Sequence, residues 1–191
     1  MKKLLSLVMG SSLLLIFPTL VLAAPYMELG YSALTMGDDS DEDADDESKT
    51  ELKTARVQAI LGTEIGNNFA IEGVIGTGVK EDSLEVLTSK LTFEFEEFYG
   101  VYARPFVNVT DNVQLFGRIG YHHFKSVIKV EDSVDEEGNR ESSVTDNDIA
   151  YGFGAALSVT ETLAITADYM NYYDYEDLTI KGFTLGLRFG F

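Results

Sequence analysis

Hydrophobic and polar residues alternate along most of the chain. The alternation is strictest over the last nine residues, where large apolar side chains occupy every second position from Phe183 to Phe191. The positions between them hold Thr, Gly and one charged residue, Arg188. A period of two predicts a β-strand with one apolar face and one small or polar face.

The same alternation recurs throughout the chain and predicts eight strands in all. Ile60 breaks the pattern of the second strand, and Glu97 falls on the apolar face of the fourth. For Glu97 we predict a position at an interface or in a β-bulge. The predicted strands cover residues 25–36, 52–65, 69–80, 89–105, 113–130, 148–159, 163–174 and 178–191.

The connections between the strands alternate in length. Short turns rich in Asn, Thr, Gly and Asp lie at 66–68, 108–112 and 160–162, and longer polar segments lie at 37–51, 81–88, 131–147 and 174–177. Short turns at one end and long loops at the other are typical of an up-and-down barrel in an outer membrane. In such a barrel the turns are periplasmic and the loops extracellular.

The polar faces of the strands carry charged residues, which decides between two kinds of barrel. A soluble barrel, the alternative, would have to bury these charges in a dry core. In a transmembrane barrel they can pair across the lumen while the apolar face meets lipid. An eight-stranded barrel is just wide enough to be filled by side chains, so we predict a plugged lumen. The predicted lumen network is Glu28, Arg56, Glu72, Glu94, Arg104, Arg118, Asp168 and Arg188.

The fold class predicted is therefore all-β, a single eight-stranded antiparallel up-and-down transmembrane β-barrel at 24–191. Before it, residues 1–23 have the features of a cleavable signal peptide: Lys2 and Lys3, an apolar run, and small residues before a cut after Ala23. The run is long enough for a single membrane anchor, the alternative, but its Ala-rich end favours cleavage. We expect export to the outer membrane of a Gram-negative bacterium.

Several short motifs, in this order, resemble the OmpA/OmpX-like family of small outer-membrane β-barrels. The resemblance covers essentially the whole mature chain. It implies a barrel and no single activity, since the family includes structural proteins, adhesins, small pores and lipid-modifying enzymes. The C-terminal Phe191 resembles the signal that the outer-membrane assembly machinery reads. The motifs are Tyr26-x3-Gly30-Tyr31, Tyr99-Gly100-x4-Pro105, 110–121 (TDNVQLFGRIGY), Tyr151-Gly152-x-Gly154 and the final Arg188-Phe-Gly-Phe191.

Charge and composition narrow the function further. The net charge is −18, which argues against a general nucleic-acid surface, and the chain has no Cys for a disulfide or a thiol nucleophile. Segment 38–51 has nine carboxylates against Lys49, net −8, and segment 131–148 has eight against Arg140, net −7. Both segments lie at the same end of the predicted barrel.

Two readings of the acidic segments stay open. Solvated loops that keep the surface charged are one. The other is a loop for Ca²⁺ or Mg²⁺, because these ions prefer carboxylate oxygens, although the spacing of a formed calcium loop is missing. No other cofactor and no firm metal site is expected. The candidate ligands are Asp38, Asp39, Asp41, Glu42, Asp43, Asp45, Asp46 and Glu47.

Aromatic residues gather near the outer strand ends. We interpret them as a girdle at the headgroup level, with a contact surface for a partner as the alternative. They are Tyr121, Phe124, Tyr151, Tyr169, Tyr172, Tyr173 and Tyr175.

Two adjacent histidines end the fifth strand. His122 and His123 point to opposite faces, so they cannot share one metal from an ideal strand. An outer-membrane enzyme acting on lipid A would need a His with a Ser and an acid, for which Ser126 and Asp168 are the nearest candidates. Their spacing is not specific, and we expect no catalytic residue.

We therefore predict a non-enzymatic outer-membrane protein that acts in envelope integrity, surface charge or adhesion. The first alternative is a narrow cation-favouring channel with an acidic mouth, and the second is the lipid-A-modifying enzyme. The expected partners are outer-membrane lipid and lipopolysaccharide, with the assembly machinery during biogenesis. We expect a monomer that binds no nucleic acid.

Overall fold

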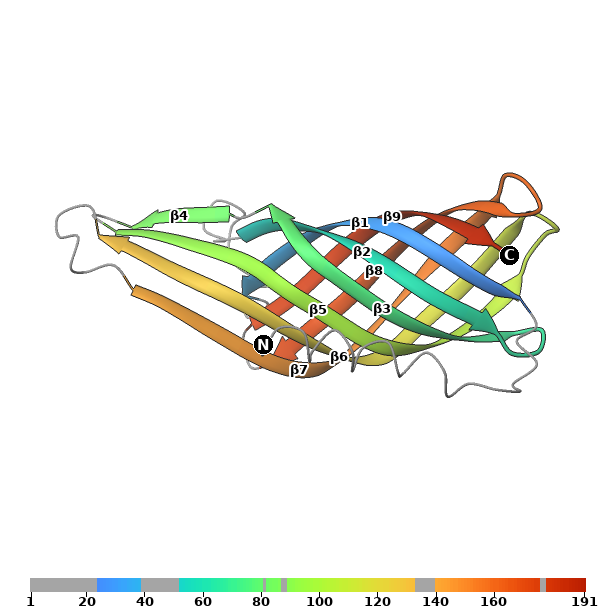
Figure 1. Cartoon of the computed structure of the whole chain (residues 1–191), viewed down its shortest axis with the longest axis horizontal. Coiled ribbons are helices and arrows are strands. Elements are labelled where there is room, and N and C mark those ends of the chain that lie inside the picture. Colours follow the sequence, from blue (N-terminus) through green and yellow to red (C-terminus); the bar gives the residue numbers. More distant parts are fainter. Residues whose placement is uncertain (1–23, 39–51, 81, 87–88, 133–139, 176–177) are drawn as a thin grey trace, which may run out of the picture.

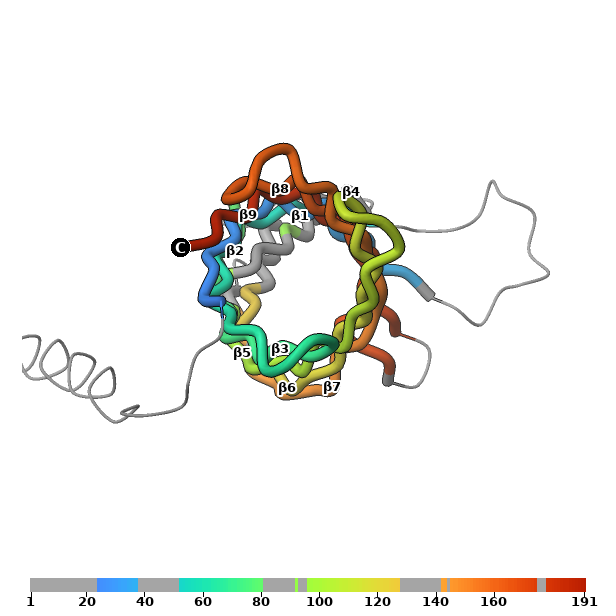
Figure 2. Tube along the Cα trace, turned by 90° about the vertical axis from the view of Figure 1, so that its right-hand side faces the viewer, coloured from blue at the N-terminus to red at the C-terminus, as the bar shows by residue number. Residues whose placement is uncertain are grey.

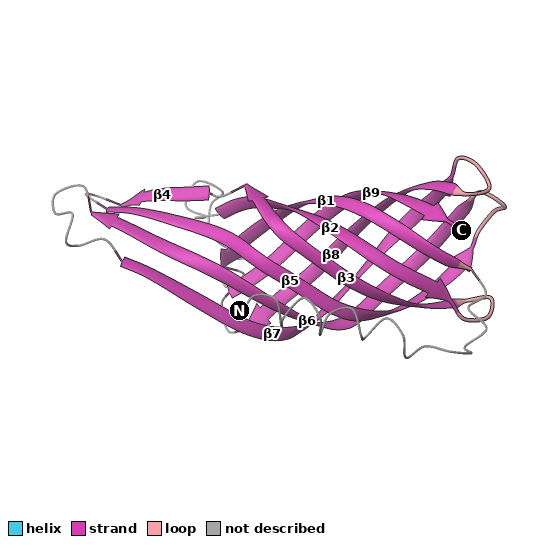
Figure 3. Ribbon diagram, in the orientation of Figure 1, coloured by secondary structure: helices cyan, strands magenta, loops and turns pink. Residues whose placement is uncertain are grey.

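The computed structural model describes residues 24–38, 52–80, 82–86, 89–132, 140–175 and 178–191 as one antiparallel sheet (Figures 1 and 3). Within these residues no helix is long and apolar enough to cross a membrane. The strands are β1 (Pro25–Asp38), β2 (Leu52–Glu64), β3 (Phe69–Lys80), β4 (Asp82–Val86), β5 (Ser89–Asn108), β6 (Val113–Asp132), β7 (Arg140–Ser158), β8 (Leu163–Tyr175) and β9 (Leu178–Gly190).

The sheet closes on itself. Its order is β3-β2-β1-β9-β8-β7-β6-β5-β4, and a further pairing of β3 with β5 joins the two ends. Figure 2, which turns the molecule by 90°, shows the resulting ring. β4 pairs with the first residues of β5 and prolongs the hairpin beyond the ring, so the barrel itself has eight strands. This confirms the predicted fold class.

The two ends of the barrel differ. Three tight connections, 65–68, 109–112 and 159–162, lie at the end where the chain terminates, and Gly66 has the positive φ of 69° that such a turn favours. At the other end β4, β5, β6 and β7 extend beyond their neighbours (Figure 1). Among the described residues, the ladder between β7 and β8 ends at Tyr151 and Asn171, whereas β6 and β7 stay paired to Val130 and Arg140.

Two predicted boundaries were wrong. The strand expected at 148–159 begins at Arg140, and the segment 81–88, expected as a loop, contains β4. Residues 140–147 are polar except for Val144, so the alternation is absent there, and β4 is only five residues long, too short for its two apolar residues, Leu84 and Val86, to establish a pattern.

Side chains on the two faces follow the predicted alternation. Outward residues such as Leu61, Ile75 and Val101 are 59%, 65% and 62% exposed. Glycines on the inward face allow the walls and interior side chains to pack closely. A Cβ added to Gly120 would lie 2.2 Å from the carbonyl oxygen of Val101.

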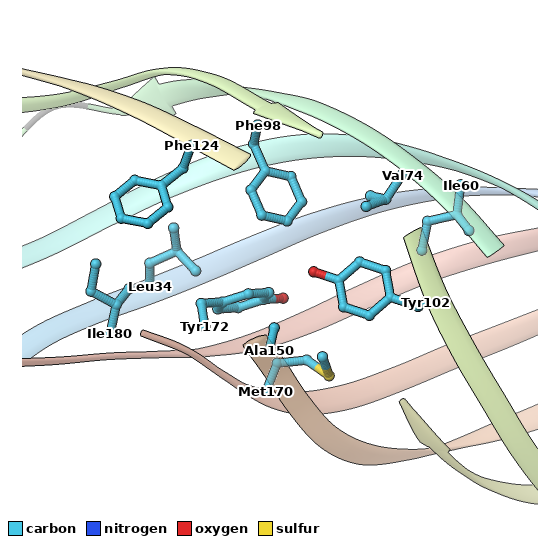
Figure 4. Close-up of a cluster of buried hydrophobic side chains, with 10 residues drawn as sticks. All are labelled: Leu34, Ile60, Val74, Phe98, Tyr102, Phe124, Ala150, Met170, Tyr172 and Ile180. Carbon is cyan, nitrogen blue, oxygen red and sulfur yellow. The ribbon is translucent and has the colours of Figure 1, made fainter. Parts of the chain in front are cut away.

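The interior also contains an apolar layer. Ten buried side chains form it, and Figure 4 shows them pointing toward one another from strands around the ring. Ile60, which breaks the alternation in the sequence, belongs to this layer. A register shift at Phe95 and Glu97 confirms the bulge considered for Glu97. The layer consists of Leu34, Ile60, Val74, Phe98, Tyr102, Phe124, Ala150, Met170, Tyr172 and Ile180.

Candidate functional site: the filled barrel interior

One arginine inside the barrel forms hydrogen bonds with three buried carboxylates. Arg118, on β6, is 4% exposed. Its Nε donates to Glu72 Oε2 at 2.7 Å, and its Nη2 donates to Glu28 Oε1 at 3.1 Å. Its third nitrogen, Nη1, donates to Asp168 Oδ2. These carboxylates come from β3, β1 and β8, so one guanidinium connects four strands across the lumen.

Two more arginines surround this centre. Arg188 Nη2 donates to Glu28 Oε2 at 2.8 Å, and Arg104 Nε lies 3.4 Å from Glu72 Oε1. The hydroxyl of Tyr26 also donates to Glu72 Oε1, at 2.6 Å. Each carboxylate of the pair Glu28 and Glu72 therefore contacts two arginines, which offsets the cost of burying it.

Gln114 joins the two outer arginines and was not among the predicted site residues. Its Oε1 accepts from Arg104 Nη2 at 2.6 Å and lies 3.5 Å from Arg188 Nη1. Tyr26 was missed as well. Both residues stand in the inward phase of their strands, so the alternation could have identified their location, but an uncharged side chain gave no reason to select them.

Arg56 lies apart from this network. Its guanidinium carbon is 3.7 Å from the ring centroid of Phe98 and 4.0 Å from that of Tyr172. Its Nε and Nη2 have no hydrogen-bond partner among the described residues. Since aromatic faces attract cations, the two rings stabilise the charge, and no carboxylate among the described side chains pairs with it.

The structure thus brings six of the eight predicted lumen residues into one network. Seven of the eight have described side chains, and all seven are 8% exposed or less. The seventh, Arg56, is the one held between rings. The side chain of Glu94 lies outside the described part, as do Asp38's side chain and the acidic residues of 39–51.

The two histidines occupy opposite faces. His122 is 1% exposed and packs near Phe98, Phe124 and Tyr172, with ring centroids 5.1, 5.7 and 6.1 Å away. His123 faces outward, stacks on Tyr99 at 4.7 Å and hydrogen-bonds Asn147 at 2.8 Å. No group of three or more His, Asp or Glu within the described part could hold a metal ion.

The predicted aromatic girdle is partly wrong. Tyr121, Tyr151 and Tyr169 do face outward, 60%, 49% and 44% exposed. Phe124 and Tyr172 instead face the interior, 6% and 5% exposed, where they complete the apolar layer. Further exposed aromatic residues on the outer wall are Tyr31, Tyr99, Phe153 and Phe183.

Carboxylates at the outer end of β7 contact β8. Asp146 accepts a hydrogen bond from the hydroxyl of Tyr173 at 3.1 Å, and Asp148 accepts one from the backbone of Asp174 at 3.3 Å. Side chains therefore bridge the two strands where their backbone ladder has ended. At the other end Phe191, 75% exposed, donates its backbone N–H to Pro25 at 3.1 Å.

Comparison with known proteins agrees with this architecture. The model of a family described as "Outer membrane protein beta-barrel domain" matches residues 12–191. No curated protein matches the sequence. The sequence resemblance to small outer-membrane barrels is thereby confirmed.

Solved structures share the fold at low sequence identity. Ail, the attachment invasion locus protein of Yersinia pestis, is 18% identical, with a TM-score of 0.58 over 88% of this chain and 98% of Ail. Neisserial surface protein A is 12% identical, with a TM-score of 0.56 over 87% and 97% of the two chains. OprG from Pseudomonas aeruginosa is 10% identical, with a TM-score of 0.56 over 88% and 96%.

Proposed function

The chain belongs to the outer membrane protein β-barrel domain family, and from that premise we propose that it is a non-enzymatic barrel with a closed lumen. The family implies the outer membrane of a Gram-negative bacterium. In our proposal the barrel is an anchor, and the acidic segments at its extracellular end act in surface charge, envelope integrity or adhesion.

The ion-pair network around Arg118 is the observation that carries this proposal. Arg118, Glu28 and Glu72 connect facing walls of the barrel at distances of 2.7 to 3.1 Å. Above it the apolar layer adds a second filled section. A path for ions would have to break both sections, and breaking a buried ion pair leaves an uncompensated charge.

The interior charges also disfavour a cation-selective channel. Among the described buried side chains there are four arginines and three carboxylates, a net charge of +1. Arg56 stands in the apolar layer without a carboxylate partner among the described residues. A cation drawn in by an acidic mouth would meet the buried guanidinium of Arg56 between the aromatic rings of Phe98 and Tyr172.

The geometry around His122 supports a non-enzymatic role. Its Nδ1 has no hydrogen-bond partner among the described residues, and the ring is enclosed by aromatic side chains. Asp168, the acid that a triad would need, is engaged by Arg118. A nucleophile and base that act together require a hydrogen bond between them.

Single-channel recording from the purified barrel in planar bilayers tests the closed lumen. We expect no discrete conductance steps from protein whose folding is verified by its heat-dependent mobility on gels. Reproducible cation-selective steps would overturn the proposal and support a channel. Lipid A incubated with the same protein should remain chemically unchanged, and a modified product would support an enzyme.

A further inference from the structure

We propose that a groove on the lipid-facing wall binds an acyl chain of the outer-leaflet glycolipid, lipid A, with its sugar headgroup at His123 and Asn147. This inference rests on the outer-membrane placement proposed above. It does not depend on whether the lumen conducts.

The groove crosses the wall diagonally between two rows of paired residues. It has a volume of about 640 Å³, within the range of roughly 300–1,000 Å³ that ligand pockets occupy. Each row crosses five strands that are about 4.8 Å apart, so each row spans roughly 19 Å. One row is Met27, Leu61, Gly73, Val101 and Tyr121, and the other is Ala59, Ile75, Tyr99, His123 and Asn147.

Two small residues on the outward face create the hollow. Gly73 and Ala59 lie between large neighbours such as Leu61 and Ile75, which are 59% and 65% exposed. A Cβ added to Gly73 would meet nothing nearer than a backbone oxygen at 4.0 Å. Interior glycines are required because a Cβ would clash, but Gly73 is not. A side chain would fit here, so packing within the chain does not explain the hollow.

The extracellular end of the groove is polar, whereas the rest is apolar. His123 and Asn147 hydrogen-bond each other at 2.8 Å, and Tyr99 stacks on the imidazole. If Nδ1 donates to Asn147 Oδ1, imidazole Nε2 remains an acceptor and the Asn147 amide nitrogen a donor. Below this pair on β6 the outward residues are Ile119 and Tyr121, so it stands where the apolar band ends.

This combination of groups fits a sugar better than a phosphate. The rim offers uncharged donors, an acceptor and aromatic rings, which suit the hydroxyl and amide groups of a glucosamine. The nearest cation along β6, Lys125, is already paired with Glu96. Because surrounding lipid is as apolar as the groove, selectivity must come from packing and from these hydrogen bonds.

A second, mainly apolar hollow, with Gln58 and Thr77 in its lining, lies beside the first. It has a volume of about 870 Å³ and shares Ala59 and Ile75 with it. A lipid with two or more chains on one headgroup could place a second chain there. Phospholipids also carry two chains, so the preference for lipid A rests on the headgroup contacts at His123 and Asn147.

Native mass spectrometry of the purified barrel, titrated with lipid A or with phosphatidylethanolamine, tests the proposal. We expect lipid A to bind about tenfold more tightly than phosphatidylethanolamine. Gly73→Leu should fill the groove and weaken lipid A binding by about tenfold. Gly117→Leu is the matched control, because Gly117 also faces outward, its Cβ would meet nothing within 3.7 Å, and it does not line the groove.

Further variants keep the test decisive. Ala59→Leu fills the same hollow from β2 if Gly73→Leu does not fold. The double change His123→Ala and Asn147→Ala should remove the preference for lipid A while leaving the fold intact. Equal affinity of the wild type for both lipids would overturn the proposal, as would equal binding by the Gly73 and Gly117 variants. A wild-type dimer that Gly73→Leu dissociates would assign the groove to a second copy of the chain instead.

Discussion

Replacing Arg118 by methionine tests whether the interior network holds the barrel closed. The substitution removes the cation that contacts Glu28, Glu72 and Asp168. Glu28 keeps Arg188 and Glu72 keeps Arg104 and Tyr26, so Asp168 bears most of the loss. Removing one partner of a buried pair costs about 3–5 kcal/mol, and we expect the free energy of unfolding to fall by that amount.

Arg56→Met is the matched control, because the side chain is as buried but has no carboxylate partner among the described residues. It loses two contacts with aromatic rings, each worth about 0.5–2 kcal/mol, and gains from removing a buried charge that no described carboxylate pairs with. The two effects oppose each other, so we expect a net change within about 2 kcal/mol. Adding Asp168→Asn to Arg118→Met should recover part of the loss, since the carboxylate that has lost its arginine disappears.

Urea titration of the barrel in lipid vesicles measures these differences. The chain has no Trp, so far-UV circular dichroism and gel mobility are the signals of choice. If Arg56→Met and Arg118→Met lower the free energy of unfolding equally, the ion pairs are not what distinguishes the two arginines. The reasoning from partners would then be refuted.

Three further predictions concern other parts of the barrel. Gly120→Ala should lower stability by about 1–3 kcal/mol in the same titration, because its Cβ would overlap a facing backbone oxygen, whereas Gly117→Ala should have little effect. Removing the two rings that hold the buried arginine, by Phe98→Ala with Tyr172→Ala, should produce conductance steps in planar bilayers where the wild type is silent. If the acidic segment 37–51 binds divalent cations, millimolar Ca²⁺ should slow its cleavage by protease. Unchanged cleavage would remove the cation hypothesis.

The alternation predicts the barrel strands well because one physical constraint acts on each of them. A strand between lipid and lumen must separate large apolar residues from small or charged ones, and Phe183–Phe191 does so without exception. Where that constraint ends, as in Arg140–Asn147, the sequence has no periodic signal although the strand continues. Strand ends outside the membrane therefore escape this kind of prediction.

The contacts inside the barrel were harder to predict than its location. That Arg118 faces inward follows from its phase, but which carboxylates it meets depends on side chains from β1, β3 and β8 across the lumen. Register between neighbouring strands relates only adjacent ones, such as Glu28 and Arg188. The apolar layer was not predicted. Its members, such as Met170, are apolar residues at inward positions, where the alternation leads one to expect polar or small residues, so the pattern gives no sign that they pack together.

The unequal ladders of β7 have a consequence for local opening. Over Tyr151–Ser158 the backbone of β7 pairs with both β6 and β8. From Arg140 to Ala150 it pairs with β6 alone among the described residues. Segments with fewer protecting hydrogen bonds open at a lower free energy than the core. Amide protons along the outer half of β7 should therefore exchange with deuterium well before those of its inner half. The two halves of one continuous strand would then open independently and at different rates.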